Sequence, residues 1–296
     1  MSRRLDAVLR GLTEGYEVLK KKAAQDVKSD EVAGLIVQLT TGALDFLSSC
    51  TEVALVSKVP DKRYFSFAMS GKKQKPSRAV NQSLFDRRCA EQMNHFLNGA
   101  LTKLSLTQRT RFLYTIAISY CCAADLLKTR DQKTPATFFE CLIGHLLARA
   151  FGITPRTQVD VLQLEEERSS LPTDFIYDLG SGKPKFHVPV KTSTRERVIQ
   201  VFAHQRVLDG VHGFGKFKGI LVCLTETKLD HLNKEVVEIC VPKQWILYQL
   251  FIAPMHRFYY FDVPVKYAQL AKGDPPMAVK PFAEFFDEVR ELAAGR

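Results

Sequence analysis

The stretch that decides the fold runs from Pro172 to Lys191 and reads PTDFIYDLGSGKPKFHVPVK. Its runs at 174–179 and 185–191 both alternate between apolar and polar residues with a period of two. The segment between them, GSGKP at 180–184, has the glycine and proline content that is typical of a turn. This pattern predicts a β-hairpin.

A turn centred near Gly182 places Asp174 beside Val190 and Lys191, at the open end of this hairpin. Side chains alternate between the two faces of a strand, so the second strand divides into two sets. Its core face is predicted to hold Phe186, Val188 and Val190, and its opposite, polar face to hold Lys185, His187, Pro189 and Lys191. Lys191 is therefore expected within reach of whatever Asp174 binds.

This pairing of an acid and a lysine has a chemical use. Hydrolysis of a phosphodiester at neutral pH needs a hard cation such as Mg²⁺ on carboxylate and carbonyl oxygens, together with a positive group beside the attacking water and the phosphate. Asp174 is predicted to hold the metal, and Lys191 to act on the water and the phosphate. An ordinary exposed charge pair is the alternative for the same spacing.

The segment after Lys191 predicts a helix. Thr192 to Thr194 offer N-cap residues, and the pattern from Arg195 to Leu208 is helical, with a stop near Gly210. Its first turn holds Arg195, Glu196 and Arg197, although the helix dipole disfavours bases there, which indicates a partner for the arginines. A guanidinium can fork onto guanine O6 and N7, and a carboxylate can accept from cytosine N4. The three residues are predicted to read G·C pairs in the major groove.

Together these residues resemble the PD-(D/E)xK nuclease superfamily, and specifically the type II restriction endonucleases that read CC/GG sites. The match consists of Pro172, Asp174, Lys191 and then the Arg-Glu-Arg string at 195–197, and the resemblance covers about residues 134 to 262. It implies an α/β fold with a mixed central sheet flanked by helices. It also implies Mg²⁺-dependent cleavage of double-stranded DNA.

The chain departs from the family pattern at two positions. Pro189 stands where the signature has its middle acid, and its side chain offers no oxygen. In the CC/GG-reading enzymes an acid on the following helix, about thirteen residues after the lysine, takes that role, and here the position holds His204, with Gln205 beside it. Imidazole suits softer divalent ions than Mg²⁺. His204 is expected instead to lie near the DNA backbone.

Glu140 is the candidate for the second metal-binding acid. Thr134 and Pro135 open a helix that runs to Phe151, and Glu140 shares its apolar stripe. A carboxylate carried into the interior needs a metal ion or a base. The resembling nucleases carry a glutamate that points into the active site on this helix. Pairing of Glu140 with His145 or Arg149 is the alternative.

The charge of the chain favours a polyanionic partner. The net charge is +10, with a pI near 9.2. Residues 1–130 hold 21 basic and 12 acidic side chains, whereas the rest holds 21 and 20. The segment from Lys58 to Arg88 is the most basic, with aromatic residues interleaved, and is expected to form a mobile loop that contacts DNA phosphates. The proposed phosphate contacts are Lys72, Lys73, Lys75 and Arg78. A solvated loop without a ligand is the alternative.

Several classes of protein are disfavoured by the remaining sequence. The seven cysteines include no CxxC pair, which fits a reducing compartment. No signal-peptide pattern follows Met1, and no run approaches 18 uninterrupted apolar residues, so we expect a cytoplasmic protein without a membrane span. No GxxxxGK[ST] phosphate loop is present, so no nucleotide cofactor is expected.

The periodicity predicts a helical part at 1–130, for DNA clamping or dimer contacts, and a nuclease core at 131–296. The expected helices of the first part are 5–26, 29–57, 84–102 and 107–128. After the hairpin and its helix, the expected elements are strands at 219–226 and 236–241, a helix from Pro242 and a last strand at 258–262.

The sequence therefore predicts a type II restriction endonuclease, part of a restriction-modification system, that acts as a homodimer on a palindromic site. A structure-selective or repair nuclease of the same superfamily is one alternative, since it would ignore sequence. A catalytically inactive DNA-binding protein is the other, because Pro189 and His204 replace two acids of the family pattern.

Overall fold

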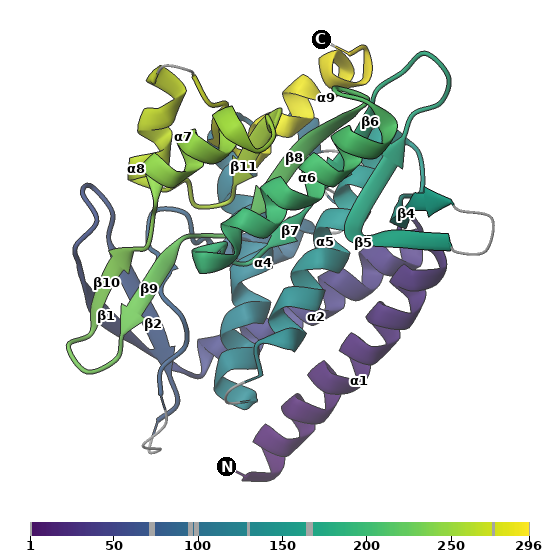
Figure 1. Ribbon diagram of the computed structural model, residues 1–296. Coiled ribbons are helices and arrows are strands. Elements are labelled where there is room, and N and C mark those ends of the chain that lie inside the picture. Colours follow the sequence, from purple (N-terminus) through teal and green to yellow (C-terminus); the bar gives the residue numbers. More distant parts are fainter. Residues whose placement is uncertain are drawn as a thin grey trace. The chain divides into compact units, whose positions relative to one another are not determined.

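The computed structural model describes residues 2–70, 75–93, 97, 101–128, 131–163, 168–273 and 276–295, and the chain forms two compact units (Figure 1). Unit 1 comprises Met1–Leu146 and Thr227–Glu238, and unit 2 comprises Leu147–Glu226 and Ile239–Arg296. These units divide the chain differently from the expected parts 1–130 and 131–296. The difference arises because one long helix, α5, contributes to both units and because residues 227–238 return to unit 1.

Unit 1 contains a group of packed helices. They are α1 (Ser2–Asp26), α2 (Asp30–Ser48), α4 (Leu106–Leu127) and the greater part of α5 (Lys133–Phe151). Local chemistry sets where they begin: Ser29 accepts from the Val32 N–H, and Ser105 and Gln108 form a capping box. Tyr120 joins three of the helices, because its ring stacks on both Tyr16 and Phe138. The expected helices at 5–26 and 107–128 are confirmed.

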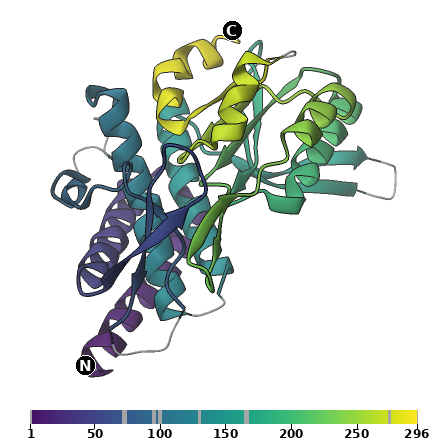
Figure 2. The same cartoon turned by 90° about the vertical axis from the view of Figure 1, so that its left-hand side faces the viewer.

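Unit 1 also contains a sheet that the sequence did not predict. Its strands follow the order β3-β2-β1-β10-β9, so segments far apart in the chain lie side by side, blue and green in Figure 2. The bounds are β1 (Thr51–Ser57), β2 (Tyr64–Ala68), β3 (Val80–Asn81), β9 (Thr227–Asp230) and β10 (Glu235–Glu238). The single helix expected at 29–57 was wrong, because α2 ends at Ser48 and the alternating TEVALVS run pairs with β2 as a strand.

The basic segment from Lys58 to Arg88 belongs partly to this sheet. Tyr64, Phe65 and Phe67 are buried, so the aromatic residues interleaved among its bases form core rather than a mobile loop. The single helix expected at 84–102 was wrong at both of its ends, where the structure has the 3-10 helices η1 (Arg87–Gln92) and η3 (Leu101–Lys103). Between them Met93 and Leu97 are helical, and the other residues of 94–100 lie outside the described part of the chain.

Unit 2 is built on a mixed sheet of order β12-β11-β8-β6-β5-β4, with β7 also paired to β8. Neighbours from β4 to β6 are antiparallel, and β6, β7, β8, β11 and β12 are parallel. The bounds are β4 (Arg156–Gln163), β5 (Arg168–Asp178), β6 (Lys185–Val188), β7 (Val190–Lys191), β8 (Phe217–Cys223), β11 (Arg257–Tyr260) and β12 (Val279–Pro281). The strand expected to be last, at 258–262, is therefore followed by another.

Helices cover both faces of this sheet. On one face α6 (Val198–His212) and α7 (Pro242–Phe251) pack through Phe202, whose ring contacts Trp245 and Phe258. On the other face the end of α5 and α9 (Phe285–Ala293) meet the sheet through Phe151, which stacks on Phe186 and contacts Phe285. The remaining short elements are η4 (Arg195–Arg197), α8 (Val265–Ala268), η5 (Gln269–Lys272) and η6 (Phe282–Glu284). The predicted α/β class, a mixed sheet flanked by helices, is confirmed.

The predicted hairpin is confirmed in its register. Phe175 lies opposite Val188, and Asp178 lies opposite Lys185, so residues whose numbers sum to 363 face each other. One prediction about it was wrong: the face of β6 that was expected to be polar is covered by α6, so His187 on that face is fully buried. The helix after the hairpin also differs, since it begins with a 3-10 turn and continues past Gly210 to His212.

Candidate active site

Asp174 and Lys191 meet at the open end of the β5–β6 hairpin, as predicted. Lys191 Nζ donates to Asp174 Oδ2 at 2.7 Å, and the backbone N–H of Val190 donates to the same oxygen at 2.7 Å. Both side chains are 22% exposed. Within the described residues, no donor lies on the other oxygen of Asp174, Oδ1. The carboxylate is therefore held by one oxygen and keeps the other available.

The second strand is interrupted just before Lys191. Pro189 has no N–H to donate and separates β6 from β7, but its carbonyl oxygen still accepts from Val222 at 3.0 Å. Leu224 N–H binds the Lys191 carbonyl at 3.0 Å, so β8 and the residue that follows it hold the backbone on both sides of Val190. Because successive carbonyls of a strand point to opposite sides, the Val190 carbonyl faces the side of Asp174.

A pocket of about 310 Å³ opens over this pair. One wall is the face of the hairpin that carries Asp174 and Lys191, and the other wall is the first half of α6. It is lined by Pro172, Thr173, Asp174, His187, Pro189, Lys191, Gln200, Val201 and His204. Pro172, Asp174, Pro189, Lys191 and His204, the positions of the catalytic pattern in unit 2, therefore share one cavity, whereas Arg195–Arg197 do not line it.

His187 contributes a buried acceptor to the pocket. The Gln205 amide nitrogen donates to the Phe217 carbonyl and to Asp209, so its oxygen faces His187 Nδ1 at 3.2 Å and that nitrogen donates. The other ring nitrogen, Nε2, is buried without a hydrogen-bond partner among the described residues. Burial lowers the pKa of His187 to about 4, with His204 adding to the shift. The ring is neutral at pH 7.

His204 also stays neutral at pH 7. Its ring centroid lies 6.3 Å from that of His187. Desolvation lowers the pKa of His204, and the charge on Lys191 lowers it further, against an opposite effect of Asp174. Two neutral imidazoles and one carboxylate thus line the cavity.

The donors fit Mg²⁺ in part. Mg²⁺ binds through one or two carboxylates and completes its shell with water and phosphate oxygens. Asp174 Oδ1 and the Val190 carbonyl supply two hard oxygens from this chain. Within the described residues, no group of three or more His, Cys, Asp and Glu side chains is placed to hold a metal ion. A metal here would therefore take the rest of its ligands from water and substrate or from a further acid.

Glu140, the residue predicted to be that further acid, lies on α5 in unit 1 and is half-buried. Its helix begins close to the expected place, at Lys133. The first turn is fixed by Asp131, whose carboxylate accepts from the N–H groups of Lys133 and Thr134. The metal-binding role of Glu140 stays a prediction.

The Arg195–Arg197 string follows the active-site strand as an exposed turn. Arg195 and Arg197 are both exposed, and Arg195 has a φ of 43°, in the left-handed region. Among the described residues, neither guanidinium has an ion-pair partner. Thr194, expected as a helix cap, instead donates its hydroxyl to Glu226 at 2.6 Å. Glu226 was not predicted, although its position directly after the apolar run GILVCLT was a usable signal.

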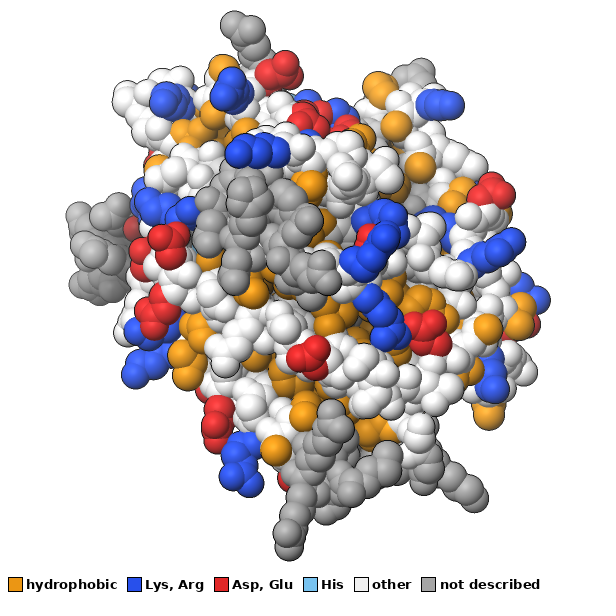
Figure 3. Space-filling model, turned by 180° about the vertical axis from the view of Figure 1, so that it is seen from behind, with side chains coloured by type: hydrophobic (Ala, Val, Ile, Leu, Met, Phe, Trp, Pro, Cys, Tyr) orange, Lys and Arg blue, Asp and Glu red, His pale blue; other side chains and the backbone are white. Residues whose placement is uncertain are grey.

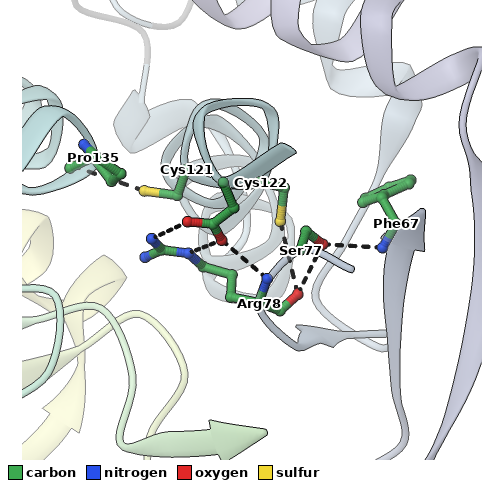
Figure 4. A network of polar contacts seen from close by, with 7 residues as sticks. Phe67, Ser77, Arg78, Cys121, Cys122 and Pro135 are labelled. Atoms are coloured by element: carbon green, nitrogen blue, oxygen red, sulfur yellow. Dashed lines mark hydrogen bonds and ion pairs between the residues drawn. The ribbon is translucent and has the colours of Figure 1, made fainter. Parts of the chain in front are cut away.

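The four basic residues expected on DNA phosphates have different surroundings. Arg78 makes a two-pronged ion pair with Asp125, at 2.8 Å for both Nε and Nη2, inside a polar network with Ser77 and Cys122 (Figure 4). Lys75 is exposed, and Lys72 and Lys73 lie outside the described residues. On the face drawn in Figure 3, the described Lys and Arg side chains stand among acidic and apolar ones and do not gather into one patch.

Comparisons with known proteins bear on the fold. The crystal structure of the Type IIP restriction endonuclease Kpn2I is similar with a TM-score of 0.80 and 23% identity, over 96% of this chain and 98% of that chain. A complex of the restriction endonuclease PspGI with substrate DNA gives a TM-score of 0.45 and 14% identity, over 69% of this chain and 93% of that chain. No protein-family model matches, and no curated protein matches. The chain thus has a restriction-endonuclease-like fold.

Within the described part of the chain, no helix is both long and apolar enough to cross a bilayer.

Proposed function

We propose that this protein is a type II restriction endonuclease, which hydrolyses phosphodiesters of double-stranded DNA at a specific G·C-containing site with Mg²⁺. The observation that carries the proposal is the Asp174–Lys191 pair at 2.7 Å on the wall of a 310 Å³ pocket. The restriction-endonuclease-like fold, which resembles that of the Type IIP restriction endonuclease Kpn2I, supports the reaction class.

The residues of the pocket have separate tasks in this proposal. Asp174 and the Val190 carbonyl would hold Mg²⁺, which supplies positive charge against a phosphate oxygen of the DNA. Lys191 lies within hydrogen-bond reach of Asp174, so its ammonium is held beside the same place and donates to the attacking water or to the phosphate. The neutral ring of His187 offers Nε2 as an acceptor for a water in the cavity.

Recognition of the DNA sequence is assigned to the turn after the active-site strand. Arg195 and Arg197 are exposed and begin four residues after Lys191, so the bases that they contact lie close to the cleaved phosphate. Arg-Glu-Arg chemistry suits consecutive G·C pairs, in keeping with a CC/GG-type site. A palindromic site requires a twofold-symmetric homodimer, and we assign the helical N-terminal part to dimer contacts or DNA clamping.

The experiment is incubation of the purified protein with a long phage DNA of known sequence and Mg²⁺. Discrete fragments that share one end sequence are expected. A smear would identify a nuclease without sequence preference, and intact DNA together with measurable binding would identify an inactive DNA-binding protein. The same assay with Asp174→Asn excludes a contaminating nuclease, because cleavage by this protein should disappear in that variant.

A further inference from the structure

Glu226 is a buried acid three residues beyond the end of β8, and its side chain binds the turn that follows Lys191. The residue is 1% exposed. Its carboxylate accepts from the Thr194 N–H at 3.0 Å, the Thr194 hydroxyl at 2.6 Å and the Ser193 hydroxyl at 2.8 Å. The Tyr260 hydroxyl donates to it at 3.2 Å, and the Cys223 thiol at 3.6 Å. All of these partners are neutral, and among the described residues no base forms an ion pair with Glu226.

A buried carboxylate without a counter-ion is energetically unfavourable at a core position. Removal of the charge from water is unfavourable, and only several well-placed donors offset it. An apolar residue would fill the same space without that requirement. Since three of the strongest contacts of Glu226 go to Ser193 and Thr194, the residue acts mainly on the conformation of this turn rather than on the packing of the sheet.

The turn at residues 193–195 has an unfavourable backbone conformation, which the hydrogen bonds to Glu226 stabilise. Arg195 has a φ of 43°, which is unfavourable for a residue with a side chain, and its N–H points at Glu226 from 3.5 Å. Thr194 is 1% exposed, whereas Arg195 and Arg197 are exposed. The buried half of the turn is therefore anchored, and the arginines project from it.

The same loop also holds the active-site strand. Leu224 N–H binds the Lys191 carbonyl at 3.0 Å, and Thr225 N–H binds the Thr192 carbonyl at 3.2 Å. Residues 224–226 thus contact the chain at each step from Lys191 to Thr194. One short segment sets the spacing between the residue assigned to cleavage and the residues assigned to base reading.

We propose that Glu226 is a positioning residue for sequence discrimination: it fixes the turn that presents Arg195 and Arg197 at a set distance from Lys191. The inference rests on the proposed function and adds a residue outside the family pattern of the sequence analysis. Without the hydrogen bonds from the turn to Glu226, Arg195 and Arg197 can contact DNA in several arrangements. Discrimination between sites then falls, whereas general affinity for DNA is kept.

The test compares Glu226→Gln with Glu288→Gln. Glutamine has the shape of glutamate but replaces one acceptor oxygen with an NH₂ group that faces the N–H and O–H donors. Glu288 is the control, because it is a carboxylate of unit 2 that also binds a tyrosine, Tyr259, and it is paired with Arg257 and Lys280. Among the described residues it makes no hydrogen bond or ion pair with residues 191–197. Two quantities are measured: the ratio of single-turnover cleavage rates on cognate and one-base-changed duplexes, and amide hydrogen exchange of residues 192–198 in the free protein.

For Glu226→Gln we expect the rate ratio to fall about tenfold, random-duplex affinity to stay unchanged and exchange at 192–198 to accelerate. Thr194→Val removes only one donor and should shift both quantities less, in the same direction, which keeps the test usable if Glu226→Gln folds poorly. A wild-type ratio in Glu226→Gln, or an equal fall in Glu288→Gln, would overturn the inference. Failure of the proposed function is separately visible, because the wild-type protein would then show no discrimination.

Discussion

Asp174 and Asp178 lie four residues apart on β5, and each pairs with a lysine across the hairpin. Lys191 approaches Asp174 at 2.7 Å, and Lys185 approaches Asp178 at 2.8 Å. The second pair is an ordinary surface feature: Lys185 is 43% exposed, and Asp178 also contacts Arg156. The first pair borders a cavity and keeps one carboxylate oxygen available. The chemical role of an Asp–Lys pair therefore depends on whether it borders a cavity, and the spacing of the two residues in the sequence does not reveal this.

The second metal-binding acid is tested by comparison of Glu140→Gln with His204→Ala. If Glu140 supplies the acid, its substitution should lower the single-turnover cleavage rate by about 100-fold or more, since a metal ligand is lost, whereas His204→Ala should be milder. Both variants are assayed with Mg²⁺ and with Mn²⁺. The reverse ranking, with better activity in Mn²⁺, would move the metal site to α6 and to a softer ligand set.

The base-reading role of the turn is tested by Arg195→Ala and Arg197→Ala. Loss of a guanidinium that forks onto guanine should reduce binding of the cognate duplex by roughly 1–3 kcal/mol and of a scrambled duplex much less. Competition titrations at fixed salt, in Ca²⁺ to prevent cleavage, measure both losses. Equal losses on the two duplexes would show that the arginines hold phosphates and do not read bases.

At the scale of elements, the sequence predicted best where a pattern was long or punctuated. The hairpin was recognisable because two alternating runs flank a glycine-rich turn, and α7 because Pro242 stands at its first position. The segment TEVALVS was assigned to a helix, because its alternation is short and its pairing with β2 and β10 is a tertiary fact. His187 was expected on a polar face for the same reason: burial by α6 is a tertiary fact.

Burial of His187 predicts a pH dependence of stability. The folded protein binds a proton on this ring only near pH 4, whereas the unfolded chain does so near the ordinary pKa of 6.5. The free energy of unfolding should therefore be unaffected by His187 above about pH 6.5 and fall by up to about 3 kcal/mol as the pH drops to 4. His187→Asn keeps a donor for Gln205 but does not titrate. Denaturant unfolding of both proteins at several pH values measures the difference, and parallel curves would contradict the prediction.

At the scale of the whole molecule, the basic residues differ in whether an acidic residue of the same chain already pairs with them. A net charge of +10 favours DNA, but it does not tell which cations are free to bind it. Arg78 was expected on a phosphate, and in the structure its guanidinium is engaged by Asp125, while Lys75 in the same segment is exposed. The composition of the sequence predicts a polyanionic partner such as DNA. The ion pair with Asp125 distinguishes Arg78 from Lys75.

Lys75→Ala and Arg78→Ala should therefore differ. Lys75→Ala should weaken binding of cognate and random duplexes alike and lower the slope of log affinity against log salt by about 1, with little change in stability. Arg78→Ala should instead destabilise the protein by about 1–3 kcal/mol, because Asp125 loses both hydrogen bonds from the guanidinium and keeps only the one from the backbone N–H of residue 78. Salt titrations and denaturant unfolding measure the two effects. A salt slope changed by Arg78→Ala but not by Lys75→Ala would reverse the assignment.

The central claim is that the Asp174–Lys191 pair cleaves DNA, and the two lysines of one hairpin test it most directly. Single-turnover cleavage of the cognate duplex is measured with Mg²⁺ for Lys191→Met and Lys185→Met, and binding of the same duplex is measured in Ca²⁺. Lys191→Met should lose a factor of about 100 to 1,000 in rate with binding retained, because it lacks the charge beside the water and the phosphate. Lys185→Met should cleave at nearly the wild-type rate. Wild-type cleavage by Lys191→Met, or equal losses in the two variants, would contradict the claim.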